Sequence, residues 1–476
     1  MKSEKLQDAI GMIDPDLILR SEKQIKKSKA KTFIKWTSPI AAILVIALAI
    51  GIFFGNGSPF ILTAYAIAEA EYPKMSPYPT GIGLVGIGSG YNNWRMDQKE
   101  RASFFGHGKN VNRLVESTAA ELLSGSGGEN VVCSPLNIYM ALAMLAEITD
   151  GESRQQILTL LNAESIEALR SEAYAVWNAN YNDDGSVTSI PASSLWLNED
   201  ISFNKNTLNT LATNYYASSY KGKTGSQRMN QALQTWLNEQ TGGLLKQYTS
   251  DIELTSETIM SLVTTIYFKA KWDSEFSKSQ TRQSIFHAEN GDILADFMHT
   301  SDTYGNYYWG EKFSATSKKL QNSGSVWFVL PDEGFSVDDI LADEEALAFL
   351  SSHDQWENHK SLIVNLSVPK FDVSSKMNLA ENLQAIGITD CFDETRADFT
   401  PLTAAEEIVY LSEIQHGARV TMDEEGVTAA AYMEMRLAGS AAPPEDEIDF
   451  VVDRPFIFII TGEDDTILFI GVVNQP

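Results

Sequence analysis

The histidines are the first side chains to consider for catalysis or metal binding. None of the six has a second histidine at the spacing of an HExxH metal site. They are His107, His287, His299, His353, His359 and His416. The chain also has no G-x-S-x-G motif, which would present a nucleophilic serine on a sharp turn, and no phosphate-binding P-loop. The sequence therefore predicts no enzyme, no metal site and no cofactor.

One glycine motif matches a dinucleotide-binding pattern by its letters alone. Residues 81–86 read GIGLVG, which fits G-x-G-x-x-G. Such a motif binds a pyrophosphate only where a strand leads into it and a helix leads out of it. Here Pro77 and Pro79 precede the motif and more glycines follow it. We interpret these residues as part of a linker.

A segment near the C-terminus combines the pattern of a strand with the composition of an exposed loop. From residue 427 every second side chain is apolar: Val427, Ala429, Ala431, Met433, Met435 and Leu437. The intervening side chains are mixed, as in a strand with one buried face. Small residues and two prolines follow, which is typical of an exposed loop. The residues alone leave two interpretations open: a permanent strand before a loop, or an exposed segment that becomes a strand.

The same segment resembles a known family. Residues 424–431 (EEGVTAAA) are similar to the hinge at the base of the reactive-centre loop of the serpins. Further stretches resemble the family in the same order along the chain: 130–136 (NVVCSPL), 236–242 (WLNEQTG), 266–272 (IYFKAKW), 328–331 (FVLP), 368–371 (VPKF), 387–390 (GITD), 397–399 (ADF), 454–456 (RPF) and 469–476 (FIGVVNQP). The likeness covers residues 110–476. It implies the α+β serpin fold, with a large mixed and mainly antiparallel main sheet, further sheets, about eight or nine helices and an exposed reactive-centre loop.

The resemblance implies irreversible suicide inhibition. In this family a protease attacks the exposed loop and forms an acyl-enzyme, and the cut loop then inserts into the main sheet. About 14 residues from Val427 to Ser440 would form a strand of roughly 46 Å, comparable to a domain diameter. The expected partner is a serine protease, or a cysteine protease, held in a covalent acyl complex by a monomeric inhibitor. The alternative is a serpin-fold binding protein or protease substrate whose loop is merely cut.

The resemblance also assigns site residues by position. The reactive bond joins Ser440 to Ala441, and its flanks are Leu437, Ala438, Gly439 and Ala442. The hinge is Glu424, Glu425, Gly426, Val427, Thr428, Ala429, Ala430 and Ala431. The breach, at the top of the main sheet where insertion begins, is Lys370, Glu424 and Trp272. The shutter, the mid-sheet cluster that must open, is Ser134, Asn137, Thr264 and His416.

The position of the reactive bond is fixed to within one or two residues. Counting along the loop places it after Ser440, whereas the stretch from there to Arg454 is longer than the family pattern. Small residues at the bond suit the pockets of elastase-like or subtilisin-like proteases. Arg436 would suit a trypsin-like pocket, but it lies too near the hinge for full insertion.

Three positions depart from the family pattern. Thr264 stands where asparagine is expected, Asn137 where serine is usual, and Tyr432 where the residue is usually small. Thr264 keeps a hydroxyl for hydrogen bonding. Tyr432 falls on the solvent face of an inserted strand, where a large side chain is tolerated.

The elements that position these residues form one mixed domain over residues 109–476. Helical spacing predicts helices at 111–123, 136–146 and 233–245. Strands are predicted at 259–268, 325–330, 362–368, 407–422, 456–460 and 466–473. Helices come first and strands dominate later, which favours an α+β fold over an alternating, doubly wound one.

The N-terminal region predicts a membrane anchor. Residues 1–35 are rich in lysine, and about 20 uncharged residues follow, enough to span a hydrocarbon core of ~30 Å. We assign 1–35 to a cytoplasmic segment, 36–57 to a transmembrane helix in the plasma membrane, and 58–108 to an extracellular stalk, because positive charge marks the cytoplasmic side. A signal peptide cleaved at 64–66, giving a secreted protein, is the alternative. An anchored chain without a disulfide framework favours a bacterial cell surface.

Charge and cysteine content narrow the partners further. The net charge is −27, yet residues 1–36 carry nine Lys/Arg and five Asp/Glu, a net +4, so the remainder carries −31. Such an acidic body disfavours nucleic acid and anionic lipid surfaces. Cys133 and Cys391 are the only cysteines. They form either a single bridge or two small buried side chains.

Overall fold

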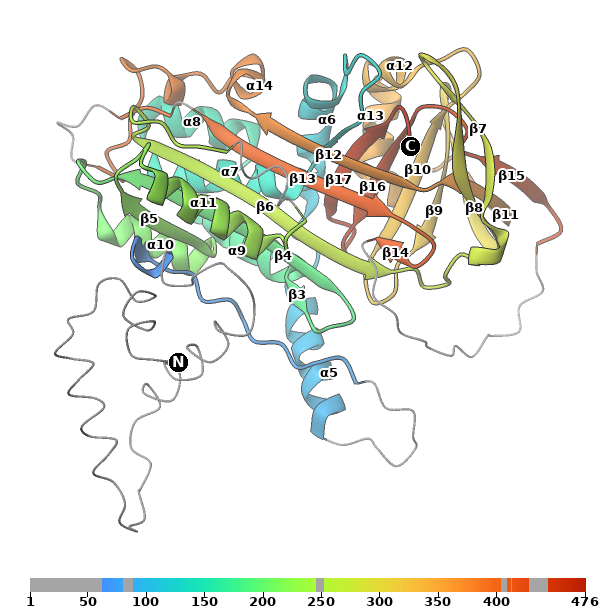
Figure 1. The fold of residues 1–476 in the computed structure, drawn as a ribbon, viewed down its shortest axis with the longest axis horizontal. Coiled ribbons are helices and arrows are strands. Elements are labelled where there is room, and N and C mark those ends of the chain that lie inside the picture. Colours follow the sequence, from blue (N-terminus) through green and yellow to red (C-terminus); the bar gives the residue numbers. More distant parts are fainter. Residues whose placement is uncertain (1–61, 80–88, 245–251, 404–408, 412, 428–443) are drawn as a thin grey trace, which may run out of the picture. The chain divides into compact units, whose positions relative to one another are not determined.

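The computed structural model describes residues 62–79, 89–244, 252–403, 409–411, 413–427 and 444–476. All of them belong to one compact unit, Phe60–Pro476. The described residues form two sheets with helices packed around them (Figure 1).

The main sheet has eight strands among the described residues, in the order β1-β5-β4-β6-β14-β13-β12, with β3 beside β4. They are β1 (Ala66–Ala68), β3 (Asn182–Asp183), β4 (Thr188–Asn198), β5 (Ala217–Gly222), β6 (Met260–Lys271), β12 (Phe371–Asn378), β13 (Ile414–Met422) and β14 (Gly426–Val427). Strands β4 and β6 pair antiparallel over ten residues and form its centre. Pairing is mostly antiparallel, but β4–β5 and β6–β13 are parallel.

Both faces of the main sheet are covered. Leu262 and Val263 are neighbours on β6 and point to opposite faces, and they belong to two separate hydrophobic clusters. One cluster contains helix α7 (Pro135–Ile148), and the other contains helix α11 (Gln227–Gln240), which lies across the sheet in Figure 1. Coverage of both faces explains why nearly every residue of β6 is buried, polar ones such as Thr264 and Thr265 included.

The second sheet has nine strands among the described residues, in the order β15-β11-β8-β9-β10-β16-β17-β2, with β7 beside β8. They are β2 (Val131–Cys133), β7 (Arg282–Ala288), β8 (Gly291–Trp309), β9 (Phe313–Lys319), β10 (Ser325–Pro331), β11 (His359–Pro369), β15 (Glu447–Val451), β16 (Phe456–Thr461) and β17 (Ile467–Val473). Every residue of β10, β16 and β17 is buried. These three adjacent strands therefore form the core of the second sheet.

The described residues contain ten α-helices, eight of which have nine or more residues. Besides α7 and α11 they are α5 (Ser89–Ala102), α6 (Lys109–Leu123), α8 (Gly151–Leu160), α9 (Ile166–Asn180), α10 (Lys205–Asn214), α12 (Val337–Leu341), α13 (Glu344–Ser352) and α14 (Ala380–Ala385). Helix α7 is buried along its whole length and begins where the Ser134 hydroxyl accepts a hydrogen bond from the Asn137 amide. The prediction of an α+β fold with a large mixed main sheet is confirmed.

Helix α11 differs from its prediction at both ends. It was expected at 233–245 and instead runs from Gln227 to Gln240. The Ser226 hydroxyl caps its start by accepting from the Met229 amide. Its end is set by Gly242 and Gly243, which both have positive φ and stop the helix before residue 245.

Part of the stretch assigned to the stalk is folded against the domain. Strand β1 pairs antiparallel with β5 at the edge of the main sheet, and the residues 89–102 form α5. The Tyr72 ring lies 5.3 Å from that of Trp177, centroid to centroid. The prolines and glycines of this stretch favoured an extended stalk, but pairing with the edge strand β5 and packing of aromatic rings hold part of it against the domain.

The predicted membrane helix, 36–57, lies outside the described residues. Within the residues that the structure describes, none of the helices is long and apolar enough to cross a bilayer. The two cysteines are both free and buried, which decides between the two expectations for them.

Candidate functional site

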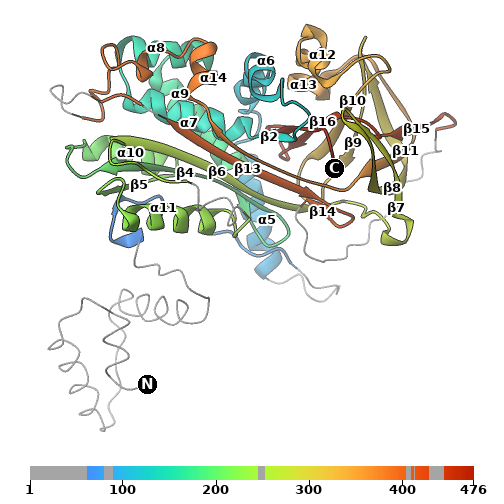
Figure 2. The ribbon, with the colours of Figure 1, turned by 45° about the horizontal axis from the view of Figure 1, so that its top comes forward.

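The main sheet contains a seam where its strand order changes along its length. At one end β6 and β13 pair directly and in parallel, from Ile414 opposite Leu262 to Gly417 opposite Thr265. At the other end β14 stands between them, with Val427 paired to both Ala270 and Met422. Figure 2 shows β14 at the end of the long strands β6 and β13. The sheet therefore already contains Val427, the first residue of the segment predicted to become a strand, together with the glycine before it.

Gly426 is required by the geometry of this short strand. Its φ is +154°, and an added Cβ would lie 2.3 Å from the carbonyl oxygen of Ala270. No side chain fits at that distance from the backbone of β6. The hinge glycine thus lets the chain approach β6 closely enough to pair with it.

The residues assigned to the breach lie close together, and Glu424 lies at their centre. The Lys370 ammonium is 3.4 Å from the Glu424 carboxylate, and the Thr281 hydroxyl donates to the same oxygen at 2.7 Å. Burial would raise the pKa of Glu424, but the Thr281 hydrogen bond and the Lys370 charge together hold it below its usual value. The carboxylate therefore stays ionised and fixes the start of the hinge.

Trp272 makes two hydrogen bonds to the turn between β13 and β14. Its indole Nε1 donates to the carbonyl of Asp423 at 2.8 Å, and its backbone amide donates to the carbonyl of Glu425. Below it lies Lys318, whose Nζ is 4.8 Å from the Phe276 ring centroid and 5.8 Å from that of Trp272. Burial lowers the pKa of Lys318, and the ring faces compensate in part for the loss of water around its charge.

The shutter residues also meet, in the middle of the sheet. His416 is fully buried and lies opposite Thr264 in the β6–β13 pairing. The Ser134 amide donates to its Nε2 at 3.1 Å, and its Nδ1 lies 3.5 Å from the Thr264 hydroxyl. Burial lowers the pKa of His416 to about 4, so the ring is neutral at physiological pH.

Asn137 contributes to the shutter through its backbone. Its amide donates to the Ser134 hydroxyl at 3.2 Å. Its side-chain nitrogen is buried, and among the described residues it has no hydrogen-bond partner; the same holds for the Thr265 hydroxyl. Unpaired buried polar groups destabilise the sheet by their lost hydration.

The remaining predicted site residues lie outside the described part of the chain. They are the hinge residues Thr428, Ala429, Ala430 and Ala431, the loop flanks Leu437, Ala438, Gly439 and Ala442, and the reactive bond Ser440–Ala441. Their roles remain predictions from the sequence.

Three further residues around the hinge were missed by the sequence analysis: Phe276, Thr281 and Lys318. The Phe276 amide donates to the Glu424 carbonyl at 3.0 Å, and the other two act through the contacts given above. All three lie more than 100 residues before the hinge, and no local pattern marks them. Only the tertiary fold brings them to it.

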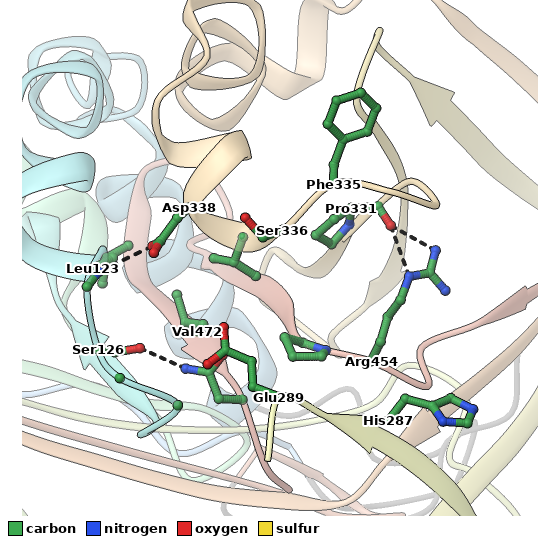
Figure 3. Close-up of a pocket in the computed structure, with 16 residues that line it drawn as sticks. Leu123, Ser126, His287, Glu289, Pro331, Phe335, Ser336, Asp338, Arg454 and Val472 are labelled. Carbon is green, nitrogen blue, oxygen red and sulfur yellow. Dashed lines mark hydrogen bonds between the residues drawn. The ribbon is translucent and has the colours of Figure 1, made fainter. Parts of the chain in front are cut away.

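One cavity lies beside the second sheet, between the end of α6 and the segment that follows β10 (Figure 3). It has a volume of about 480 Å³ and is lined by apolar groups such as Leu123 and Val472 and by polar groups such as Glu289. The Arg454 guanidinium at its rim donates twice to the carbonyl of Pro331, and Asp338 accepts from the Gly125 amide. The Arg454 hydrogen bonds join the turn after β15 to the end of β10.

A family model described as "Serpin (serine protease inhibitor)" matches residues 110–476. The chain belongs to the serpin family. Curated relatives include the serine protease inhibitor of Cyanea capillata, 27% identical over 76% of this chain and 97% of that protein, and Serpin-ZX of Arabidopsis thaliana, 28% identical over 74% and 93%.

Solved serpin structures share the fold. The thermophilic serpin Tengpin in its native state has a TM-score of 0.68 at 23% identity, covering 85% of this chain and 98% of its own. Human thyroxine-binding globulin has a TM-score of 0.66 at 23% identity, covering 77% and 99%. Serpins are in general protease inhibitors and not enzymes, although this second neighbour is named for binding a small molecule.

Proposed function

We propose that this serpin is an irreversible suicide inhibitor of serine proteases that prefer small side chains at the cleaved bond. The observation that supports the proposal is β14, which stands between β6 and β13 at one end of the seam. The next strand residues alternate apolar and mixed side chains, as a strand buried on one face requires.

The chemistry follows from the loop sequence. The protease serine oxygen attacks the carbonyl carbon of Ser440, and the amine of Ala441 leaves with a proton from the protease histidine. The product is an ester between the protease and the new C-terminus of the loop. Water would normally hydrolyse this ester, but insertion of the loop pulls the protease across the domain and distorts the geometry that activates water.

The test is to mix the full-length chain, kept in a mild detergent, with an elastase-like and a subtilisin-like protease. We expect a complex that survives denaturing electrophoresis near the summed mass, and mass spectrometry should place the cut after Ser440 or within two residues of it. Cleavage of the loop with fully active protease left over would instead indicate the alternative, a substrate or binding protein.

A matched pair of variants separates insertion from simple cleavage. Ala429→Arg would place a charge on the face that must become buried, and Ala430→Arg would place the same charge on the solvent face. We expect the first variant to be cut without trapping the protease and the second to trap it as the wild type does. Equal trapping by both would contradict insertion in this register.

We further propose that the protein is held at the outer face of a bacterial plasma membrane by residues 36–57, with residues 1–35 inside. The lysines before an apolar stretch of about 20 residues support this orientation. Expressed in bacteria, the chain should stay with membranes washed in alkaline carbonate and should be released when 36–57 are deleted. A secreted product that begins shortly after residue 66 would support signal cleavage instead.

A further inference from the structure

The cavity in Figure 3 has the size and the walls of a small-molecule site. Its volume of about 480 Å³ falls within the range of roughly 300–1,000 Å³ that such sites occupy. Apolar side chains from α6, β10, α12, β17 and the turn before β16 line it: Leu123, Pro331, Val337, Pro455 and Val472. Residues far apart in the sequence meet around one hollow, so the site exists only in the folded chain.

The glycine-rich turn at residues 125–128 forms one wall of the cavity and is held by two hydrogen bonds. The Ser126 hydroxyl accepts from the Asn474 side-chain nitrogen at 2.8 Å, and the Gly125 amide donates to the Asp338 carboxylate at 3.2 Å. The glycines at the first and third positions of the turn have positive φ, and a Cβ on either would meet no other atom within 4 Å. The wall is therefore fixed in place but has no side chains at these positions to fill the cavity.

The two basic residues that line the cavity, Arg454 and His287, already have partners. Arg454 donates to the carbonyl of Pro331 and to the carboxylate of Asp453. The Nδ1 of His287 lies 2.7 Å from a carboxylate oxygen of Asp292. An anionic ligand would therefore have to displace an existing interaction to reach either positive charge.

The two carboxylates that line the cavity are not neutralised in this way. The Glu289 carboxylate has no hydrogen bond or ion pair with any residue that the structure describes. It lies against the glycine-rich turn, where a Cβ on Gly128 would be 3.5 Å from its Oε2. The Asp338 carboxylate accepts from the Gly125 amide and, within the described ranges, from nothing else. Figure 3 shows the Glu289 side chain beside Val472, so negative charge and apolar surface lie together in one cavity.

We infer that this cavity binds a small organic cation, a protonated amine on a compact apolar body. The ammonium group donates to the Glu289 carboxylate, with Asp338 as a second negative charge nearby, and the apolar body packs on Leu123 and Val472. Charge-assisted hydrogen bonds are stronger than neutral ones, more so where the site is partly closed to water, and burial of the apolar body adds to the affinity. The site is independent of protease inhibition, since none of these residues belongs to the hinge, the breach or the shutter.

The test uses fluorine NMR with the full-length chain in a mild detergent and three probes of similar shape. They are 4-fluorophenethylamine, which is a cation, the neutral 2-(4-fluorophenyl)ethanol and the anion 4-fluorophenylacetate. We expect the chain to broaden the amine signal with a Kd of about 1 mM, as suits a ligand of about ten non-hydrogen atoms. The alcohol should bind about fivefold more weakly, and the acetate should not bind. Each titration is corrected for broadening by the detergent alone.

Glu289→Gln removes the charge without changing the shape of the side chain, and Glu257→Gln is its matched control. Glu257 is an exposed carboxylate in the turn before β6 and does not line the cavity, and both substitutions change the net charge by the same amount. We expect Glu289→Gln to weaken binding of the amine about fivefold and to leave binding of the alcohol unchanged. Glu257→Gln should match the wild type. Both variants should keep the wild-type thermal midpoint, because both side chains are exposed.

Asp338→Asn is a second variant, because it removes the other charge but keeps an oxygen for the Gly125 amide, and it should also weaken binding of the amine. Wild-type affinity for the amine in both cavity variants would overturn the site, as would equal binding of the amine and the alcohol by the wild type. An equal loss in Glu257→Gln would overturn it too, because the amine would then be attracted by the acidic surface as a whole. Failure of the wild type to broaden the amine signal would refute the site directly.

Discussion

The backbone amide of Ser134 donates a hydrogen bond to Nε2 of His416 across the middle of the main sheet. Because Nε2 must be the acceptor, the neutral ring carries its proton on Nδ1, facing the Thr264 hydroxyl. The start of α7 and the strands β6 and β13 are thereby joined through one imidazole. Protonation at Nε2 would remove the acceptor and break this hydrogen bond between α7 and the main sheet.

This relationship predicts acid destabilisation of the closed sheet. The pKa of His416 is about 4 in the folded protein and about 6.5 in an unfolded chain. The unfolded state therefore binds the extra proton first, and stability falls as the pH drops from about 6.5 towards 4, by about 3 kcal/mol in all. Urea unfolding at several pH values should show this slope.

The slope should belong to His416 alone. In His416→Gln, the loss of stability between pH 6.5 and pH 4 should be smaller by about 3 kcal/mol. The variant will also be less stable at neutral pH, because the ring is lost. His359→Gln, at an exposed site, should keep the wild-type slope. The same pH dependence in all three proteins would show that other groups cause it.

Gly426→Ala tests whether the close approach of β14 to β6 matters for inhibition. The new methyl group would meet the Ala270 carbonyl oxygen, and a positive φ adds further strain, together about 1–3 kcal/mol. If this opposes insertion, insertion slows by about tenfold for each 1.4 kcal/mol. More inhibitor should then be cut per protease trapped, as measured by titration of protease activity. Gly90→Ala, where a methyl group meets nothing within 4 Å, should behave as the wild type.

Glu424→Gln tests the ion pair at the breach. The variant keeps an oxygen for the Thr281 hydroxyl but loses the charge that faces Lys370. We expect the free energy of unfolding to fall by about 1 kcal/mol, since the pair is largely buried. Glu425→Gln is the comparison, because its partner Lys278 is mostly exposed, and it should change stability by less than about 0.5 kcal/mol. A larger effect at Glu425 would contradict the importance of the buried pair.

Sequence alone identified most of the fold and the centre of the site because these residues carry local patterns. The run from Pro135 to Ile148 is apolar apart from Asn137 and Glu147, so a buried helix was the simple interpretation. The hinge glycine and its small neighbours likewise form a compact motif. His416 and Ser134 were assigned to one cluster only through the family resemblance. They are 282 residues apart, and no local sequence pattern connects them.

The features that the sequence did not reveal all depend on tertiary contacts. Glycines and prolines between residues 69 and 100 favoured a stalk, yet β1 pairs with the edge of the main sheet and α5 packs against α9. Whether a strand edge is paired depends on which other segments of the folded chain reach it. A short stretch of sequence contains no information on those segments. Lys318 was missed for the same reason, because its aromatic neighbours Trp272 and Phe276 come from another strand and the turn after it.

Tyr72→Ala tests whether this N-terminal segment stabilises the domain. The Tyr72 ring packs near Trp177 and Tyr181, at 5.3 and 5.7 Å between centroids, and its hydroxyl donates to Gln240 of α11. Loss of two aromatic contacts and of buried ring surface should lower the free energy of unfolding by about 2 kcal/mol. Differential scanning calorimetry should then give a thermal midpoint lower by several degrees.

Tyr91→Ala on α5 is the matched control. This ring is exposed and lies 6.0 Å from that of Trp94, so its removal should change the free energy of unfolding by less than about 0.5 kcal/mol. An equally small effect for Tyr72→Ala would show that the segment rests on the domain without stabilising it. A large effect would mean that residues 62–79 must be kept in any fragment used to study inhibition, because Tyr72 contacts the helix that lies across the main sheet.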